Sequence, residues 1–129
     1  MKKKLIIPLI VLVTILCSSF SISAQSFIVS DVQFGSDISE YRKQQTLKEA
    51  LGAQIDLQFF DNKVKMIAHT ENGDEVDILN KVNSTKYEMD RNNSKFVLEL
   101  NTLIAYIRSF TLTVYKNNQL EGIITAKRK

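Results

Sequence analysis

The sequence predicts a mainly β domain, because apolar and polar residues alternate along most of it and turn-forming residues separate the alternating stretches. Alternation over about four or more residues indicates a strand with one face toward solvent. Asn72-Gly73 and Asn117-Asn118 accept the positive φ angles that hairpin turns need. Residues 36–51 follow a helical period instead. The expected order is one strand, one helix and about six to seven further strands joined by short turns.

Residues 25–34 form the first expected strand, and the helix follows it directly. Ser36 or Asp37 can cap this helix, and Glu40 completes a capping-box pattern. Gly52 stands where a helix commonly ends, so we expect about three to four turns. One partly apolar face of the helix comprises Ile38, Tyr41, Gln45, Lys48 and Leu51.

The later strands carry apolar residues at every second position, which defines the predicted interior. Sheets with this many strands tend to close, because exposed edges promote aggregation. We therefore predict a small antiparallel up-and-down β-barrel, or a curled half-barrel, with the helix at one end. The alternative is an α+β fold in which one antiparallel sheet wraps around the helix, but the number of strands favours the barrel. The alternating positions are Ile55, Leu57 and Phe59; Val64, Met66 and Ala68; Val76 and Ile78; Tyr87 and Met89; Phe96, Leu98 and Leu100; Phe110, Leu112 and Val114; and Leu120, Ile123 and Ile124.

Residues Met1 to Ala24 have the three parts of a bacterial secretory signal peptide: a lysine cluster, an apolar run and a serine-rich exit. The run from Leu5 to Leu16 is shorter than the roughly 20 residues that span a membrane. We predict cleavage after Ala24 and one exported domain, residues 25–129, in the periplasm or outside the cell. The alternative is a lipid anchor through Cys17, although the residue before it is not small.

The charge that remains after the signal argues against a nucleic-acid partner. Lys2, Lys3 and Lys4 account for the formal excess of +3, so residues 25–129 carry 14 basic and 14 acidic residues. No stretch interleaves basic with aromatic residues as nucleic-acid interfaces do. The only cysteine, Cys17, lies in the signal, which excludes disulfides, thiol catalysis and zinc–thiolate sites from the domain.

No set of residues in the domain specifies a reaction, a metal or a cofactor. His69 is the only histidine and falls on the predicted outer face of its strand. The sequence contains neither a Gly-x-Ser-x-Gly elbow nor a glycine-rich phosphate loop. The acidic residues from Glu71 to Asp77 lack calcium-loop spacing, and we expect them to face Lys63 and Lys65 across a hairpin. We therefore expect a protein without enzymatic activity and without a bound cofactor.

Large and adaptable side chains occupy several of the interior positions. A small barrel of this lipocalin-like architecture either fills its interior with side chains or encloses one ligand. The leading prediction is a binding module for a small apolar or amphipathic molecule, and the competing interpretation is that the same residues form the core. The candidate ligand-binding residues are Phe59, Met66, Tyr87, Met89, Phe96 and Phe110.

Residues 102–109 interrupt the alternation with an apolar run. A strand buried on both faces, or a bend where a strand changes partners, would explain this run. The functional alternative is an exposed apolar lip that contacts a partner. The domain would then be an interaction protein, such as an inhibitor or an accessory subunit of a periplasmic or surface complex. The candidate partner surface comprises Leu103, Ile104, Tyr106 and Ile107.

Overall fold

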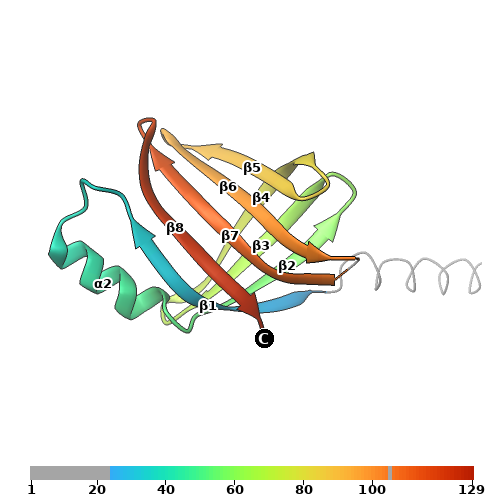
Figure 1. Ribbon diagram of the computed structural model, residues 1–129, viewed down its shortest axis with the longest axis horizontal. Coiled ribbons are helices and arrows are strands. Elements are labelled where there is room, and N and C mark those ends of the chain that lie inside the picture. The colour runs from blue at the N-terminus through green and yellow to red at the C-terminus, as the bar shows by residue number, and fades with distance from the viewer. Residues whose placement is uncertain (1–23, 105) are drawn as a thin grey trace, which may run out of the picture.

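Eight antiparallel strands form a closed barrel in the computed structural model, which describes residues 24–104 and 106–129 (Figure 1). Each strand is hydrogen-bonded to its neighbours in the chain, and β8 closes the barrel on β1. The prediction of an up-and-down barrel with one helix after the first strand is confirmed, and the α+β alternative is wrong. The predicted signal peptide, Ala24 apart, lies outside the described residues. The elements are β1 (Gln25–Phe34), α2 (Glu40–Ala50), β2 (Gln54–Phe60), β3 (Lys63–Thr70), β4 (Gly73–Asn83), β5 (Lys86–Arg91), β6 (Ser94–Leu103), β7 (Tyr106–Lys116) and β8 (Gln119–Arg128).

Inward side chains from all eight strands meet in one apolar core. Its centre includes an edge-to-face pair, Phe27 with Phe110, whose ring centroids are 5.1 Å apart. Full burial of an aliphatic or aromatic side chain contributes about 1.5–3 kcal/mol, so this core is the main source of stability. The largest fully buried side chains are Phe27, Leu57, Val64, Leu79, Leu98 and Phe110.

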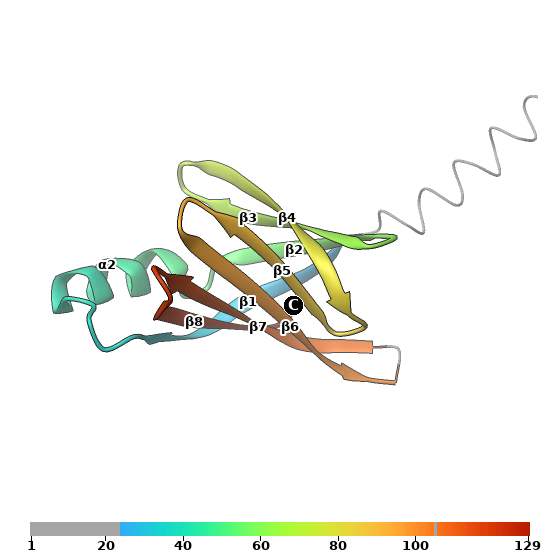
Figure 2. The same ribbon diagram turned by 90° about the horizontal axis from the view of Figure 1, so that it is seen from above.

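The two ends of the barrel carry different connections (Figures 1 and 2). At one end lie α2 and the turns that join β3 to β4, β5 to β6 and β7 to β8, and we call it the helix end. At the opposite end β1 begins, and the β6–β7 hairpin extends beyond the barrel wall, so we call it the tip end. Asn residues with φ between 49° and 66° form the β5–β6 and β7–β8 turns at the helix end, as hairpin geometry favours.

Helix α2 forms where it is predicted, but it packs differently. Ser39 caps it by accepting a hydrogen bond from the Arg42 amide at 3.3 Å, in place of Ser36 or Asp37. No residue of α2 is buried, and Tyr41 on the predicted apolar face is 72% exposed. With so few apolar side chains the helix gains little from burial, and it lies beyond the barrel wall as Figure 2 shows. The hydroxyl of the exposed Tyr41 accepts a hydrogen bond at 3.1 Å from the side-chain amide of Gln45, which lies 4 residues further along α2.

Strand β4 presents the face opposite to the one that its sequence predicts. Val76 and Ile78 are 49% and 51% exposed, whereas Leu79 is fully buried in the core. The register explains this, because Leu79 pairs with the buried Val64 and therefore shares its inward direction. The expectation that Val76 and Ile78 face inward is therefore wrong. The first half of β4 extends past its ladder with β5, which begins only at Asn80.

Candidate ligand-binding site

The six residues predicted to line a ligand cavity all lie in or against the core. Met66, Tyr87 and Phe110 are buried. The other three are partly buried and pack against that core, as with the tilted Phe59–Tyr87 ring pair at 5.9 Å. Burial raises the pKa of the Tyr87 hydroxyl above its ordinary value. The set consists of Phe59, Met66, Tyr87, Met89, Phe96 and Phe110, and of these only Phe96 lines the pocket described next.

An apolar pocket of about 310 Å³ lies at the helix end, between α2 and the ends of β1, β6, β7 and β8. Its apolar walls continue the inward faces of these strands, and they are only partly buried. Ligand pockets in proteins are commonly mostly apolar, with a few polar groups that orient the ligand. We call this the helix-end pocket, and it is lined by Val32, Phe34, Ile38, Arg42, Thr46, Ser94, Phe96, Val114, Glu121, Gly122 and Ile124.

Polar groups occupy the side of the helix-end pocket that α2 covers. Arg42 and Thr46 stand one helical turn apart and both line it. The Arg42 guanidinium donates to a Glu121 carboxylate oxygen at 3.2 Å, which links α2 to β8. Arg42 remains 60% exposed and has five N–H donors, so most of its hydrogen-bonding capacity is open to another acceptor. The pocket thus combines apolar walls with one ion pair, between Arg42 and Glu121, at its rim.

Sequence reasoning missed most of this pocket for a structural reason. β1 pairs with β2 only from Gln25 to Ile28, and its later residues pair with β8. A bulge between Val29 and Asp31 restores the inward direction of Val32. The spacing of Arg42 and Thr46 does place both residues on one face of the helix. The sequence does not show that this face is directed toward the barrel.

His69 belongs to a polar network on the outer wall. Its Nε2 lies 2.8 Å from Asp56 Oδ2, and its Nδ1 lies 2.8 Å from Asp74 Oδ1. The hydrogen bond with Asp56, followed by the one with Asp74, raises the pKa of His69 above 6.5. Burial alone would raise the pKa of Asp56, but hydrogen bonds from His69, Gln54 and Ser26 lower it below 3.8.

This network lacks the geometry of a hydrolytic triad. A catalytic base must keep one ring nitrogen for the nucleophile, and both nitrogens of His69 face carboxylates. The Ser26 hydroxyl donates to Asp56 Oδ1 at 2.8 Å, so it is bonded to the carboxylate and not to the imidazole. The cluster is therefore a cross-strand clamp that joins β1, β2, β3 and β4.

The acidic hairpin between β3 and β4 does not pair with Lys63 and Lys65 as expected. Asp74 contacts His69, and Asp77 receives a hydrogen bond from Arg91 at 2.6 Å. The register places Lys63 opposite Asn80 and Lys65 opposite Ile78. The hairpin acids lie nearer the β3–β4 turn than the partners of these lysines. That expectation is wrong.

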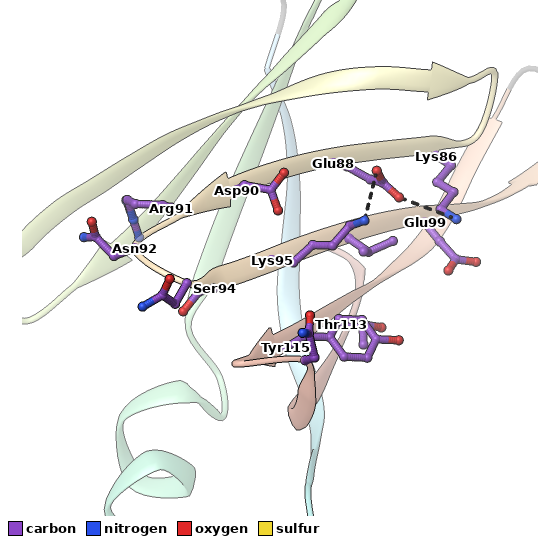
Figure 3. A pocket seen from close by; sticks show the side chains of 13 residues that line it. Lys86, Glu88, Asp90, Arg91, Asn92, Ser94, Lys95, Glu99, Thr113 and Tyr115 are labelled. Carbon is purple, nitrogen blue, oxygen red and sulfur yellow. Dashed lines mark ion pairs between the residues drawn. The ribbon is translucent and has the colours of Figure 1, made fainter.

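A polar hollow of about 810 Å³ lies on the outer wall of β5, β6 and β7 (Figure 3). Glu88 lies between two lysines there, 3.7 Å from Lys86 and 3.6 Å from Lys95. Asp90, Arg91 and Glu99 balance the remaining charge, so the hollow favours neither anions nor cations. We regard it as ordinary charged surface, since exposed pairs of this kind contribute little.

The predicted partner surface forms the β6–β7 hairpin. Leu103, Ile104 and Tyr106 are 57%, 97% and 49% exposed, so the run is not a strand buried on both faces. Ile107 differs from the other three because it is partly buried and packs against the core. The alternation breaks here because the chain reverses, with Leu103 paired to Tyr106.

Within residues 24–104 and 106–129, no three His, Cys, Asp or Glu side chains are placed to hold a metal ion. The same residues contain no helix with the length and apolarity to cross a membrane. Comparison of the chain with known protein families, curated proteins and solved structures finds no match.

Proposed function

We propose that the protein binds a small amphipathic molecule with an anionic head, holding the apolar part in the helix-end pocket. The observation that carries the proposal is this pocket of about 310 Å³, whose apolar walls continue the barrel interior. Its volume is at the lower limit of known small-molecule sites, which favours a short single-chain ligand. The function is binding without catalysis, and the signal pattern of residues 1–24 supports a place for it outside the cytoplasm.

The polar rim supports the choice of an anionic head. Arg42 reaches the pocket from α2, and Thr46 and Ser94 line the same space. A carboxylate at this rim would receive charge-assisted hydrogen bonds from Arg42, which are about twice as strong as neutral ones. Glu121 already accepts one hydrogen bond from Arg42, so the head would share the guanidinium with it.

The proposed site retains only one of the six residues that the sequence predicts to bind a ligand. A ligand in the centre of the barrel would have to displace Met66, Tyr87 and Phe110, which are buried there. Protein interiors are close-packed, so displacing such residues is costly. Phe96 is the one predicted residue that also lines the helix-end pocket, and it becomes the floor of the proposed site.

Titration with decanoate and with decanol, followed by calorimetry or native mass spectrometry, tests the proposal. Val114→Phe fills the pocket and should weaken binding of both probes at least about tenfold. Thr113→Phe is the matched control, because Thr113 lines the outer hollow on the same strand. Equal affinity in these two variants, or no binding of either probe, would reject the pocket.

A second pair of variants tests the role of the head group. Arg42→Gln should weaken decanoate about tenfold and leave decanol unchanged, because a hydrogen bond to a charged group is lost. Lys43→Gln is the control on the next residue, whose ammonium contacts Glu40 and does not line the pocket. An equal loss for both probes would show that Arg42 shapes the pocket and does not recognise the anion.

A further inference from the structure

Three large apolar side chains project from the β6–β7 hairpin at the tip end. Leu103, Ile104 and Tyr106 are exposed, and Ile104 is 97% exposed. We call these three residues the apolar tip. Single exposed apolar residues are ordinary on protein surfaces, but adjacent ones at a protruding turn commonly mark an interaction site.

The backbone of the apolar tip is also strained. Ile104 has φ 57°, in the left-handed region that β-branched residues avoid. The hairpins of the helix end place Asn at such angles: Asn92 and Asn93 in one, Asn117 and Asn118 in the other. Asn or Gly would fit position 104 with less strain, so the isoleucine indicates a use for its apolar side chain.

A hollow of about 390 Å³ adjoins the apolar tip and is cationic. We call it the cationic hollow, and none of the described residues that line it is acidic. The Arg128 guanidinium carbon lies 4.4 Å from the Tyr106 ring centroid, and its Nη1 donates to the Ile107 carbonyl at 3.3 Å. Within the described part of the chain, Arg108 and Lys127 form no ion pair. The lining residues are Asn101, Tyr106, Arg108, Ser109, Lys127 and Arg128.

Lysine residues and exposed apolar residues also occur elsewhere around the tip end. Lys63, Lys81, Lys86 and Lys129 lie at the strand ends of this side, and the acidic residues beside them are Asp61 and Glu99. Phe60 and Val82 are also exposed there, at 40% and 53%. A surface that combines apolar side chains with excess positive charge is complementary to an anionic lipid interface.

We propose that the tip end docks on the surface of a bilayer that contains anionic phospholipids. The apolar tip enters the interfacial layer, and the cationic hollow receives a lipid phosphate, for which Arg and Lys are the usual donors. This docking does not depend on the helix-end pocket. That pocket lies beside α2, and Figure 1 shows α2 at the end of the barrel opposite to the β6–β7 hairpin.

Vesicle co-sedimentation of the protein purified from a bacterium that exports it tests the proposal. Binding to vesicles of phosphatidylglycerol mixed with phosphatidylcholine should be at least about tenfold stronger than to phosphatidylcholine alone, and it should weaken with salt. Ile104→Asn should weaken binding about tenfold, and Arg108→Gln or Lys127→Gln about fivefold each. Glycerol phosphate at millimolar concentration should not release the protein, because a free phosphate offers nothing to the apolar tip.

Two controls remove the same chemical groups elsewhere on the molecule. Ile78→Thr removes an apolar side chain of β4 that is 51% exposed, and Lys48→Gln removes a cation from α2 at the helix end. Both should bind vesicles as the unmodified protein does, and both share its N-terminus, so any contribution of that segment cancels. Equal binding to the two vesicle types, or unchanged binding of Ile104→Asn, would overturn the proposal. Release by glycerol phosphate would also overturn it, in favour of a soluble phosphate ligand.

Discussion

The two ends of the barrel are built from the same alternating strands, yet one is filled and the other holds a pocket. Toward the tip end Phe27, Val64 and Phe110 are fully buried. At the helix end, inward residues such as Phe96 and Val114 are only partly buried. This difference in burial arises from the barrel wall. The pairing of β1 with β2 ends at Ile28, and the chain forms α2 before it enters β2. At these positions alternation identifies the side chains that point inward, while strand pairing determines whether they meet.

The largest effect is expected in the filled half of the barrel. Phe110→Ala should lower the free energy of unfolding by about 3–5 kcal/mol, because it leaves a cavity beside Phe27. Phe96→Ala removes the same ring from a partly buried position, so its cost should be smaller by about half. Urea unfolding followed by circular dichroism measures both. Equal losses would mean that the helix end is packed as tightly as the tip end.

The hairpin turns of the two ends provide the next prediction. Ile104→Asn should stabilise the protein by about 1 kcal/mol, because it relieves the strain of φ 57° at an exposed position. The reverse exchange at the helix end, Asn118→Ile, should destabilise it by about 1 kcal/mol at φ 66°. Thermal unfolding measures both shifts. A loss of stability in Ile104→Asn would show that the apolar tip supports the fold.

The pH dependence of stability should depend on the outer-wall network that joins β1 to β4. The pKa of His69 is raised in the folded state, so its contribution is present below pH 6.5 and is lost as pH rises through the folded value. The pKa of Asp56 is lowered, so its contribution is present above pH 3.8 and is lost as pH falls through the folded value. The melting temperature measured by calorimetry should therefore fall as the pH rises above 6.5 and through the raised pKa of His69. His69→Gln should remove that fall, and an unchanged slope would contradict the assignment.

The sequence predicted the strands, the helix and the barrel because each depends on local periodicity and turn residues. It predicted the wrong face of β4, because Val76, Ile78 and Leu79 are all apolar and only pairing with Val64 decides which points inward. The helix-end pocket was largely missed for a similar reason. Its position depends on where β1 parts from β2, which is a long-range property of the sheet.

The run around Ile104 was identified as unusual, but its meaning was not decided by the sequence. Periodicity does not separate a doubly buried strand from an exposed turn when neither Gly nor Asn marks the reversal. The left-handed φ of Ile104 identifies the turn. An isoleucine at that position does not signal a turn in the sequence. Strained positions of this kind are where local rules are expected to fail.

The smallest effect concerns the ion pairs Arg42–Glu121 and Arg91–Asp77. Arg42→Gln should change the free energy of unfolding by less than about 0.5 kcal/mol, because Arg42 and Glu121 are 60% and 28% exposed and solvent screens their pair. Arg91→Gln should cost more, about 1 kcal/mol, because Asp77 is only 15% exposed and would lose a 2.6 Å hydrogen bond. Paired urea titrations of the two variants separate these values. A stability-neutral Arg42→Gln that still loses decanoate binding would assign Arg42 to the ligand, whereas a loss of 1 kcal/mol or more, about twice the expected limit, would make it a strut between α2 and β8.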